Sequence, residues 1–446
     1  MDGWLRARLS PREDPRVLFG LATIGLLLMP LVFHLMLPKG LAGFHVSLLA
    51  ETLIFAVFAT AFNLLYGYTG LLSFGHAMFV AVAGYAVAKV FTVVAPSLAV
   101  VGGVAPLVTW LVGVALGIVV AGVVGVFIGY LAVQLEEIYF ALITLSFSMA
   151  IYAAANQDVP GAILARFGIG DGTFTNESDG LTFIPGEVDL LGVEFLLVNL
   201  RDPVGFYVLT VFVFVAAIYA MWRIVRSPFG MTSKAIRENP ERARAMGIDV
   251  TFHRWMTFII SGLFSGLAGA MLVTLDGNVN PQNHAYWTAS AVPVVMTVIG
   301  GPLSFVGPIV GAFTFEYLRW LISQNAFLEQ YWQFSFGVLL VVVVLFFENG
   351  VAGGLKWTYR RFRAWLLEAR ARYRADGLKG FGVFIVETVV GLVRAAAAAV
   401  VAWVRTAVAK VVALVRWVVG LVVALVRWVV GLVVGLFRAV RRRVPG

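Results

Sequence analysis

Long apolar runs constrain the fold of this chain more than any other feature of its sequence. Ten runs follow one another, and most are close to the roughly 20 residues that a helix needs to cross a bilayer. In lipid, every backbone N–H and C=O group must be paired within the protein, which a helix achieves by itself. The sequence therefore predicts an all-α, polytopic transmembrane helix bundle of about ten spans. The runs lie at residues 17–37, 48–66, 78–95, 104–132, 138–156, 203–224, 255–275, 288–301, 303–323 and 331–347.

Two runs depart from the ordinary length and suggest interrupted or re-entrant segments. The run at 288–301 is short, and its length alone leaves open whether it spans or re-enters. The run at 104–132 is long enough to be tilted or interrupted at its glycines. Composition supports a membrane protein, because 61% of the residues are hydrophobic and only 13% are charged. The chain has no cysteine, which excludes disulfides and thiolate metal sites.

Loop charges predict the orientation of the helices. Residues 223–254 carry seven Lys or Arg side chains against three acidic ones, and short cytoplasmic loops collect basic residues. Residues 158–202 carry eight acidic side chains and two arginines, which favours the outside. One run, 203–224, separates the two loops, so they must lie on opposite faces. The same rule places the N-terminus and the end of the core in the cytoplasm of a multi-pass cell-membrane protein.

The C-terminal segment differs from the runs before it. Arginine recurs there every eleven residues, at Arg394, Arg405, Arg416, Arg427 and Arg438. Eleven residues make three helical turns, so a helix here would carry a slowly drifting arginine stripe. An amphipathic helical tail lying in the membrane interface fits this pattern. Self-associating helices and a low-complexity extension without function are the alternatives.

Three domains follow from these patterns. They are a transmembrane domain at 1–350 that includes the polar loop 226–254, a basic cytoplasmic linker at 351–380, and the repeat-bearing tail at 381–446.

The polar, basic loop carries the most informative motif. Residues 241–247 read ERARAMG, which resembles the E-A-A-x-x-x-G coupling loop of ABC importer permeases, with arginine at the second position. Asn239 as N-cap and Pro240 in the first turn predict a short helix over about 240–247, which Gly247 would end. The resemblance implies that this helix docks on a separate ATPase. The implied coupling residues are Arg237, Glu238, Glu241, Ala243, Ala245, Met246 and Gly247.

Three more segments resemble the branched-chain amino-acid (LIV-type) permeases, in particular their M-type subunit. Residues 61–77 read AFNLLYGYTGLLSFGHA, residues 298–312 read VIGGPLSFVGPIVGA, and residues 138–145 read IYFALITL. They are similar to the family's N-L-x-x-G-Y-T-G-x-x-S-x-G-H-A, I-G-G-x-G-S-x-x-G-P-x-x-G-A and G-I-Y-F-A-L-x-T-L patterns, with Glu137 at the first position of the last. Leu303 stands where a third glycine is usual, so the hinge there is expected to be stiffer. The resemblance covers about 17–350 and none of the tail.

These segments supply the candidates for a substrate path or hinge. Closely spaced glycines let the backbone bend, and polar side chains offer hydrogen bonds within an apolar bundle. A Gly/Pro-interrupted apolar segment indicates a discontinuous helix, a frequent place for substrate contact. Close helix packing is the alternative interpretation of the same residues. The candidates are Asn63, Gly70, Ser73, Gly75, His76, Thr144, Gly300, Gly301, Gly307 and Pro308. No metal site is expected, because His76 has no second ligand at a suitable spacing.

The resemblance implies the permease subunit of an ABC importer for branched-chain amino acids. Its implied partners are a second homologous permease subunit, two ATPase subunits, an external substrate-binding protein and membrane lipids, with no nucleic acid. No cofactor is expected in this chain, because it lacks a Walker A pattern; ATP and Mg would bind the ATPase subunits. Neither H-E-x-x-H nor G-x-S-x-G is present, so the chain is not expected to be an enzyme.

Three alternatives stay open at this point. The first is an ABC permease for urea or short amides, since relatives that carry them resemble this family closely. The second is an ATP-independent channel or carrier. The apolar runs contain no series of Asp, Glu or His residues, which argues against a proton-coupled carrier. The third is a scaffold organised by the tail. Of the isolated charges, Glu316 and Arg319 are three residues apart and can pair, and structural roles are expected for them and for Glu51 and Lys89.

Overall fold

The computed structural model describes most of the transmembrane domain. It covers residues 15–354 apart from 37, 136, 169–172, 188, 191–192, 195–198, 332–333, 336, 339–340 and 342–349. The chain divides into two units, Met1–Lys356 and Trp357–Gly446, and the described residues belong to the first. The tail at 381–446 and nearly all of the linker at 351–380 lie outside the described residues, so the arginine-striped helix stays a prediction.

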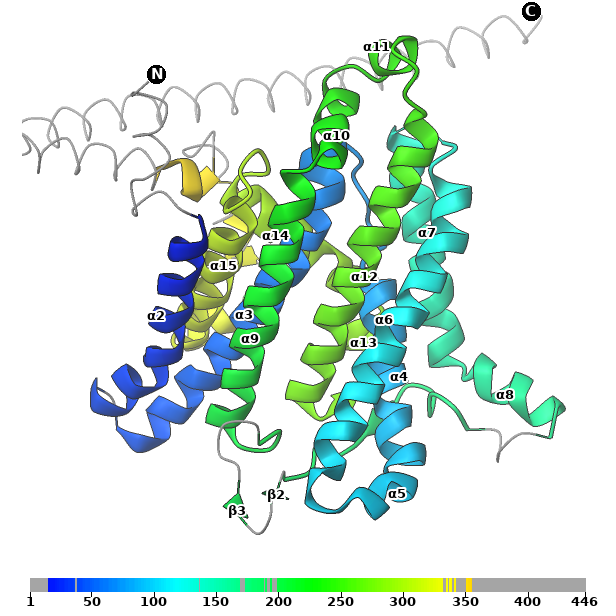
Figure 1. Ribbon diagram of the computed structural model, residues 1–446. Coiled ribbons are helices and arrows are strands. Elements are labelled where there is room, and N and C mark those ends of the chain that lie inside the picture. Colours follow the sequence, from blue (N-terminus) through cyan, green and yellow to red (C-terminus); the bar gives the residue numbers. More distant parts are fainter. Residues whose placement is uncertain are drawn as a thin grey trace, which may run out of the picture. The chain divides into compact units, whose positions relative to one another are not determined.

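Nine of the ten apolar runs coincide with helices. These are α2 (Pro15–Met36), α3 (Lys39–Thr69), α4 (Ala77–Lys89), α6 (Ala105–Ala132), α7 (Glu137–Asn156), α9 (Pro203–Val225), α12 (Val250–Asp276), α14 (Trp287–Gly300) and α15 (Gly307–Ser323). Within the described residues, six helices are long and apolar enough to cross a membrane. The prediction of an all-α, polytopic membrane protein is therefore confirmed (Figure 1). The tenth run, 331–347, lies mostly outside the described residues.

Short elements connect these helices. The helical ones are a π-helix (Val90–Val94), α5 (Ala95–Leu98), a 3-10 helix (Ala99–Val104), α8 (Val159–Arg166), α10 (Pro228–Glu238), α11 (Pro240–Ala245), α13 (Pro281–His284) and α16 (Ala326–Gln330). The described strands are β1 (Leu181–Thr182), β2 (Asp189–Leu190), β3 (Val193–Glu194) and β4 (Asn278–Val279). They form two antiparallel pairs: β1 pairs with β4, with Leu181 opposite Val279, and β2 pairs with β3.

The helix α3 is the centre of the bundle. It packs against α9, α12, α14 and α15, and its apolar side chains form much of the main hydrophobic core. In contrast, α6 packs on α4 and α12 along one side only, and α7 makes few contacts with the bundle. The long run at 104–132 forms α6 as one continuous helix, without an interruption at its glycines.

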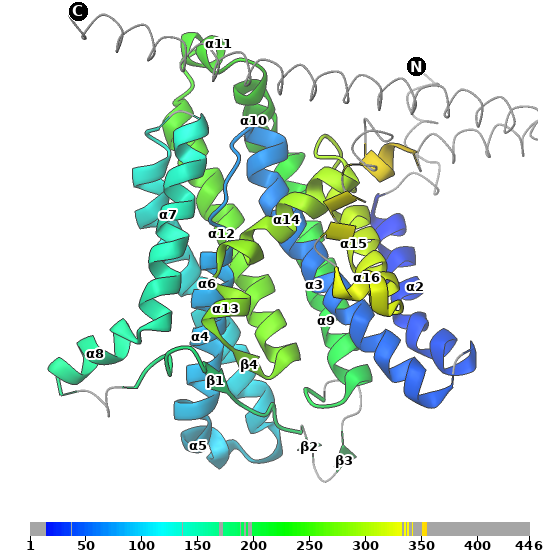
Figure 2. The same cartoon turned by 180° about the vertical axis from the view of Figure 1, so that it is seen from behind.

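The two charged loops lie at opposite ends of the bundle, as their charges predict. The basic loop forms α10 and α11 at one end, and the acidic loop forms α8, β2 and β3 at the other (Figures 1 and 2). The pairing of β1 with β4 ties the acidic loop to the end of α12 that is farther from α11.

Two of the crossings are only partly helical. The first follows α3, which ends at Gly70, a residue with a left-handed backbone (φ 79°). An irregular segment runs from Gly70 to the start of α4 at Ala77, and α4 continues this crossing. The second broken crossing starts beyond α12, passes through β4 and α13, and continues as α14. The two meet where the backbone N–H of Ala77 donates a hydrogen bond to Ser290 Oγ (2.9 Å), in the first turn of α14.

The short run at 288–301 takes part in a complete crossing. Ahead of it, His284 Nε2 lies 3.3 Å from Asp276 Oδ2, at the end of α12 that is far from α11. Behind it, the carbonyl oxygen of Pro302 packs against Gly67, whose own carbonyl is bonded to Arg237 in α10. The segment therefore runs from one end of the bundle to the other, and α14 forms its second half.

Candidate functional site

Local capping forms the helix α11 in the basic loop. Pro240 occupies its first turn, and the Asn239 side chain accepts a hydrogen bond from the backbone N–H of Arg242 (2.8 Å). Gly247 has a left-handed backbone (φ 85°), which a glycine adopts without strain, so the helix stops there. The predicted helix over about 240–247 is thus confirmed as Pro240–Ala245.

The predicted coupling residues fall into two sets, one buried and one exposed. Ala243 is buried in a small cluster with Ile236 and Val250, which holds α11 against α10 and the start of α12. The other members on the tip are exposed. They are Glu238, Glu241, Ala245, Met246 and Gly247, and 67% of the Met246 surface is exposed. These residues are therefore accessible at the tip of the loop.

Arg237, another predicted coupling residue, is exposed but also bonds to the bundle. Its Nη1 donates a hydrogen bond to the carbonyl oxygen of Gly67 (2.5 Å), near the end of α3. Its Cγ also lies within contact distance of Gly70. The Nζ of the neighbouring Lys234 lies 5.4 Å from the centroid of the Tyr68 ring. The helix α10 is therefore fastened to the bend that ends α3.

His253 provides a second attachment for α10. Its Nε2 and the Ser233 hydroxyl lie 2.9 Å apart, and its ring stacks on Phe229 with centroids 4.2 Å apart. Sequence reasoning missed Ser233 and His253, because neither belongs to the motif and their pairing depends on how α10 folds back on α12.

His76 joins the irregular segment after α3 to α12. It is fully buried; Nδ1 lies 3.0 Å from Ser73 Oγ, and Nε2 lies 2.8 Å from Ser261 Oγ. Ser261 gives its one hydroxyl proton to the carbonyl oxygen of Ala61 (2.7 Å), so it accepts from Nε2–H. Nδ1 then accepts from Ser73. Both ring nitrogens are satisfied within the protein, which indicates that His76 anchors the segment. Ser261 was not predicted.

Other predicted residues form contacts around the same segment. A side chain on Gly75 would overlap the carbonyl oxygen of Thr144, so this glycine allows α7 to approach the irregular segment. Asn63 is buried beside Gly67, and neither its amide nitrogen nor its amide oxygen has a hydrogen-bond partner among the described residues. Both Asn63 and the carbonyl oxygen of Pro302 lie against Gly67.

The remaining predicted residues form the turn between α14 and α15. A side chain on Gly300 would overlap the carbonyl oxygen of Gly307, and one on Gly307 would overlap that of Gly301. Gly301 has a φ of 100°, and Pro308 lies in the first turn of α15. The two helices therefore touch backbone to backbone, as a hinge of glycines allows. The predicted path residues thus lie in two groups, one at His76 and one at this turn.

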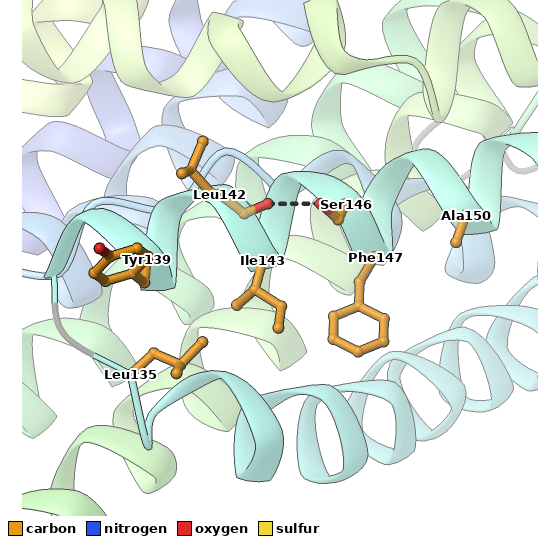
Figure 3. A pocket seen from close by; sticks show the side chains of 7 residues that line it. All are labelled: Leu135, Tyr139, Leu142, Ile143, Ser146, Phe147 and Ala150. Carbon is orange, nitrogen blue, oxygen red and sulfur yellow. Dashed lines mark hydrogen bonds between the residues drawn. The ribbon is translucent and has the colours of Figure 1, made fainter.

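A larger cavity lies apart from both groups. It has a volume of about 510 Å³ and follows the outward face of α7, where Tyr139, Ile143 and Phe147 line it (Figure 3). Leu135, just beyond α6, closes one side of it. Its lining is almost wholly apolar, and none of the predicted path residues contributes to it. It is suited to an apolar partner or lipid rather than to a polar solute.

Asp158 organises the acidic end of the bundle. Its carboxylate accepts hydrogen bonds from the backbone N–H groups of Gly161 (3.1 Å), Phe174 (2.7 Å) and Thr175 (2.8 Å), and from the Thr175 hydroxyl (2.9 Å). Burial raises the pKa of this carboxyl, but the hydrogen bonds from Thr175, Phe174 and Gly161 outweigh it, so the net pKa lies below its ordinary value. The loop is thereby clamped to the end of α7.

Comparison with known proteins gives a consistent picture. The profile of the family described as branched-chain amino acid transport system / permease component matches residues 44–344. The high-affinity branched-chain amino acid transport system permease protein LivM of Salmonella typhimurium is 24% identical over 339 residues, which cover 74% of this chain and 73% of the relative. LivM of Escherichia coli K12 is 23% identical over 346 residues, with 74% and 73% covered.

A shorter similarity extends to a sugar permease. The fructose import permease protein FrcC of Rhizobium meliloti is 26% identical over 125 residues, which cover 27% of this chain and 35% of the relative. No solved structure matches the chain.

Proposed function

Because this chain belongs to the branched-chain amino acid permease family of ABC transporters, we propose that it forms the membrane path of an importer for branched-chain amino acids. It is a multi-pass membrane protein and a transport component rather than an enzyme. Separate ATPase subunits would supply the energy, with ATP and Mg bound to them. A second homologous permease subunit and an external substrate-binding protein would complete the complex.

The basic loop is the main support for this proposal, because its contacts could transmit a displacement of α11 to the helix bundle. The tip of α11 exposes Glu241 and Met246, where an ATPase subunit would bind. Behind the tip, Ala243 is buried, so α11 and α10 would move together. Arg237 then connects α10 to the carbonyl of Gly67 at the bend of α3. A displacement of α11 would therefore act on the point where the central helix ends and the irregular segment begins.

The bend leads directly to the broken crossings. Beyond Gly70, the irregular segment is fixed to α12 through His76 and to α14 through Ser290. In the proposed cycle, ATP closes the ATPase dimer and α11 is displaced. The bundle then opens toward the loaded binding protein. Each ligand must bind one state better than the other for this switch to occur.

The proposed orientation follows from the same elements. The end with α10 and α11 would face the cytoplasm and the ATPase subunits, because its loop is basic. The end with α8, β2 and β3 would face the binding protein outside.

Co-purification from detergent-solubilised native membrane tests the proposed partners. We expect the wild-type chain to bring an ATPase and a second permease with it. In a Glu241→Lys, Gly247→Leu variant, the reversed charge and the strained left-handed position should remove the ATPase while the second permease stays bound. The paired permease serves as the control for folding. A wild-type chain that purifies alone and moves solute in liposomes without ATP would instead support the channel interpretation.

Substrate screening with the purified complex separates the remaining alternatives. Uptake of leucine, isoleucine and valine is expected to exceed uptake of urea. Uptake of urea alone would support the short-amide permease instead.

A further inference from the structure

Three charged side chains meet between α3 and α15. Nη1 of Arg319 lies 3.7 Å from Glu51 Oε1 and 3.8 Å from Glu316 Oε2. Both distances are too long for hydrogen bonds, so the guanidinium holds neither carboxylate firmly. The side chains of Arg319 and Glu51 are 58% and 30% exposed, whereas that of Glu316 is 1% exposed. This cluster therefore reaches from the surface into the bundle.

The cluster has one positively charged donor, Arg319, for two carboxylates. Two carboxylates share one guanidinium, and Asp276 lies near enough to add its repulsion to Glu51. The second oxygen of Glu316, Oε1, is buried and has no hydrogen-bond partner among the described residues. A buried carboxylate oxygen without a donor is destabilising, so a ligand that donates to it would stabilise the cluster.

The position of Glu51 along α3 indicates what surrounds the cluster. Glu51 lies about 18 Å along the helix from its first residue, at a rise of 1.5 Å per residue, so it is far from either end. Ionisable side chains at such depth face the bundle interior or a water-filled cavity rather than lipid. We therefore expect the face of α3 and α15 that carries Glu51 and Arg319 to border the interior of the assembled complex or a water-filled cavity.

We propose that Glu51, Glu316 and Arg319 form a binding site for an α-amino acid, a proposal that rests on the function proposed above. The ammonium group would donate to Glu316 Oε1 and to Glu51, and the substrate carboxylate would accept from the Arg319 guanidinium. Beside Arg319, the ring of Trp320 lies 5.1 Å from that of His45, which gives a partly apolar surface for an aliphatic side chain.

The place of the cluster in the bundle agrees with an amino acid as the ligand. The neighbouring Asp276 ends α12, whose other end follows α11, so the site lies toward the face where the binding protein would deliver substrate. In the proposed transport cycle, a separation of α15 from α3 would make the buried Glu316 oxygen accessible to the substrate.

The number of leucine molecules imported per ATP hydrolysed tests this site. The complete complex is reconstituted in proteoliposomes with its binding protein, and the wild type is compared with Glu316→Gln and Arg319→Gln. Each variant should import at least tenfold less leucine per ATP, while ATP hydrolysis stays within twofold of the wild type. Misfolding would lower both rates together, so the ratio separates binding from folding. Glu51→Gln provides a more exposed substitution if Glu316→Gln does not assemble.

A matched control comes from an ion pair outside the proposed path. Arg201 Nη1 and Glu187 Oε1 are 3.0 Å apart on the acidic loop, and both side chains are largely exposed. Glu187→Gln and Arg201→Gln should leave the leucine-to-ATP ratio unchanged. Unchanged ratios in the Glu316, Arg319 and Glu51 variants would overturn the site. A wild-type complex that hydrolyses ATP but imports no branched-chain amino acid would instead overturn the proposed substrate.

Discussion

The helices α3 and α6 are similar in length and apolar composition, but they have opposite surroundings. α3 has 31 residues and α6 has 28. In the most apolar stretch of each, 89% of the α3 residues are buried, against 33% for α6. Helices surround α3, whereas α6 leaves Leu111, Val119 and Phe127 exposed on its free side.

The difference teaches where function is located in this fold. α3 is approached through glycines and small polar residues. Ser261 and Thr297 on neighbouring helices donate to its backbone carbonyls. The exposed face of α6 carries apolar side chains that suit lipid or another subunit. The same hydrophobic composition thus supports a buried central helix in one case and an outer helix in the other.

A pair of glycine substitutions should give the largest difference in stability between changes in α3 and changes in α6. An alanine at Gly67 in α3 would overlap the carbonyl oxygen of Pro302, whereas an alanine at Gly113 in α6 has its nearest neighbour, the Val87 Cα, at 3.3 Å. We expect Gly67→Ala to destabilise the protein by about 3 kcal/mol, since overpacking against backbone is not easily relieved. Gly113→Ala should stay within about 1 kcal/mol of the wild type. Thermal unfolding in detergent measures both, and equal effects would contradict the assignment of α3 as the tightly packed centre.

Removal of single hydroxyl groups should give the next largest difference. Ser261→Ala leaves the buried His76 and the carbonyl of Ala61 without their shared partner, at a cost of about 1–3 kcal/mol. Ser146→Ala, on the exposed face of α7, removes a hydrogen bond to the Leu142 carbonyl and should cost less than about 0.5 kcal/mol. The same thermal measurement applies. A larger effect at Ser146 would show that α7 is more than an outer helix.

The connection from α10 to α3 should affect transport rather than stability. Arg237→Gln removes the guanidinium bond to Gly67, so we expect about tenfold slower uptake, equivalent to about 1.4 kcal/mol, with ATP hydrolysis retained. Arg244→Gln, on the exposed surface of α11, is the control for a lost positive charge and should transport within twofold of the wild type. Equal uptake by the two variants would show that Arg237 does not transmit the motion.

The smallest expected effect concerns Asp158 at the outer end of α7. Its pKa is depressed in the folded protein, so its contribution to stability is present above the ordinary value near 3.9 and is lost as the pH falls through the lower folded value. Asp158→Asn should lower stability by about 1 kcal/mol at pH 7, and the difference from the wild type should shrink as the pH falls below the ordinary carboxyl pKa toward the lower folded value. Melting temperatures of both proteins between pH 7 and pH 3 measure this. A difference that is constant over this range would exclude a role for the carboxylate charge.

Much of the fold could be predicted because its causes are local. A run of about 20 apolar residues has few alternatives to a membrane helix, and the α11 helix depends on Asn239, Pro240 and Gly247, which lie within nine residues of one another. The opposite charges of the two loops likewise predicted that these loops lie at opposite ends of the bundle.

The contacts that organise the candidate site could not be predicted in the same way. Arg237 bonds to a carbonyl 170 positions away, and His76 bonds to a serine 185 positions away. Ala77 is capped by a serine 213 positions away. Such pairs depend on how the helices pack, which local patterns do not encode. Glycine spacing indicated a bend after Gly67 and Gly70, but the partners of the bend had to be seen in the structure.

Uptake by the complete complex in sealed vesicles tests the central claim most directly. Radiolabelled leucine would be supplied with the binding protein on the outer side, with ATP or a non-hydrolysable analogue enclosed on the side of α11. If this chain is a permease driven through α11, leucine accumulates above its external concentration only when ATP is hydrolysed. Leucine that equilibrates at the same rate with the analogue would contradict the account, because the chain would then conduct without a drive from its partners.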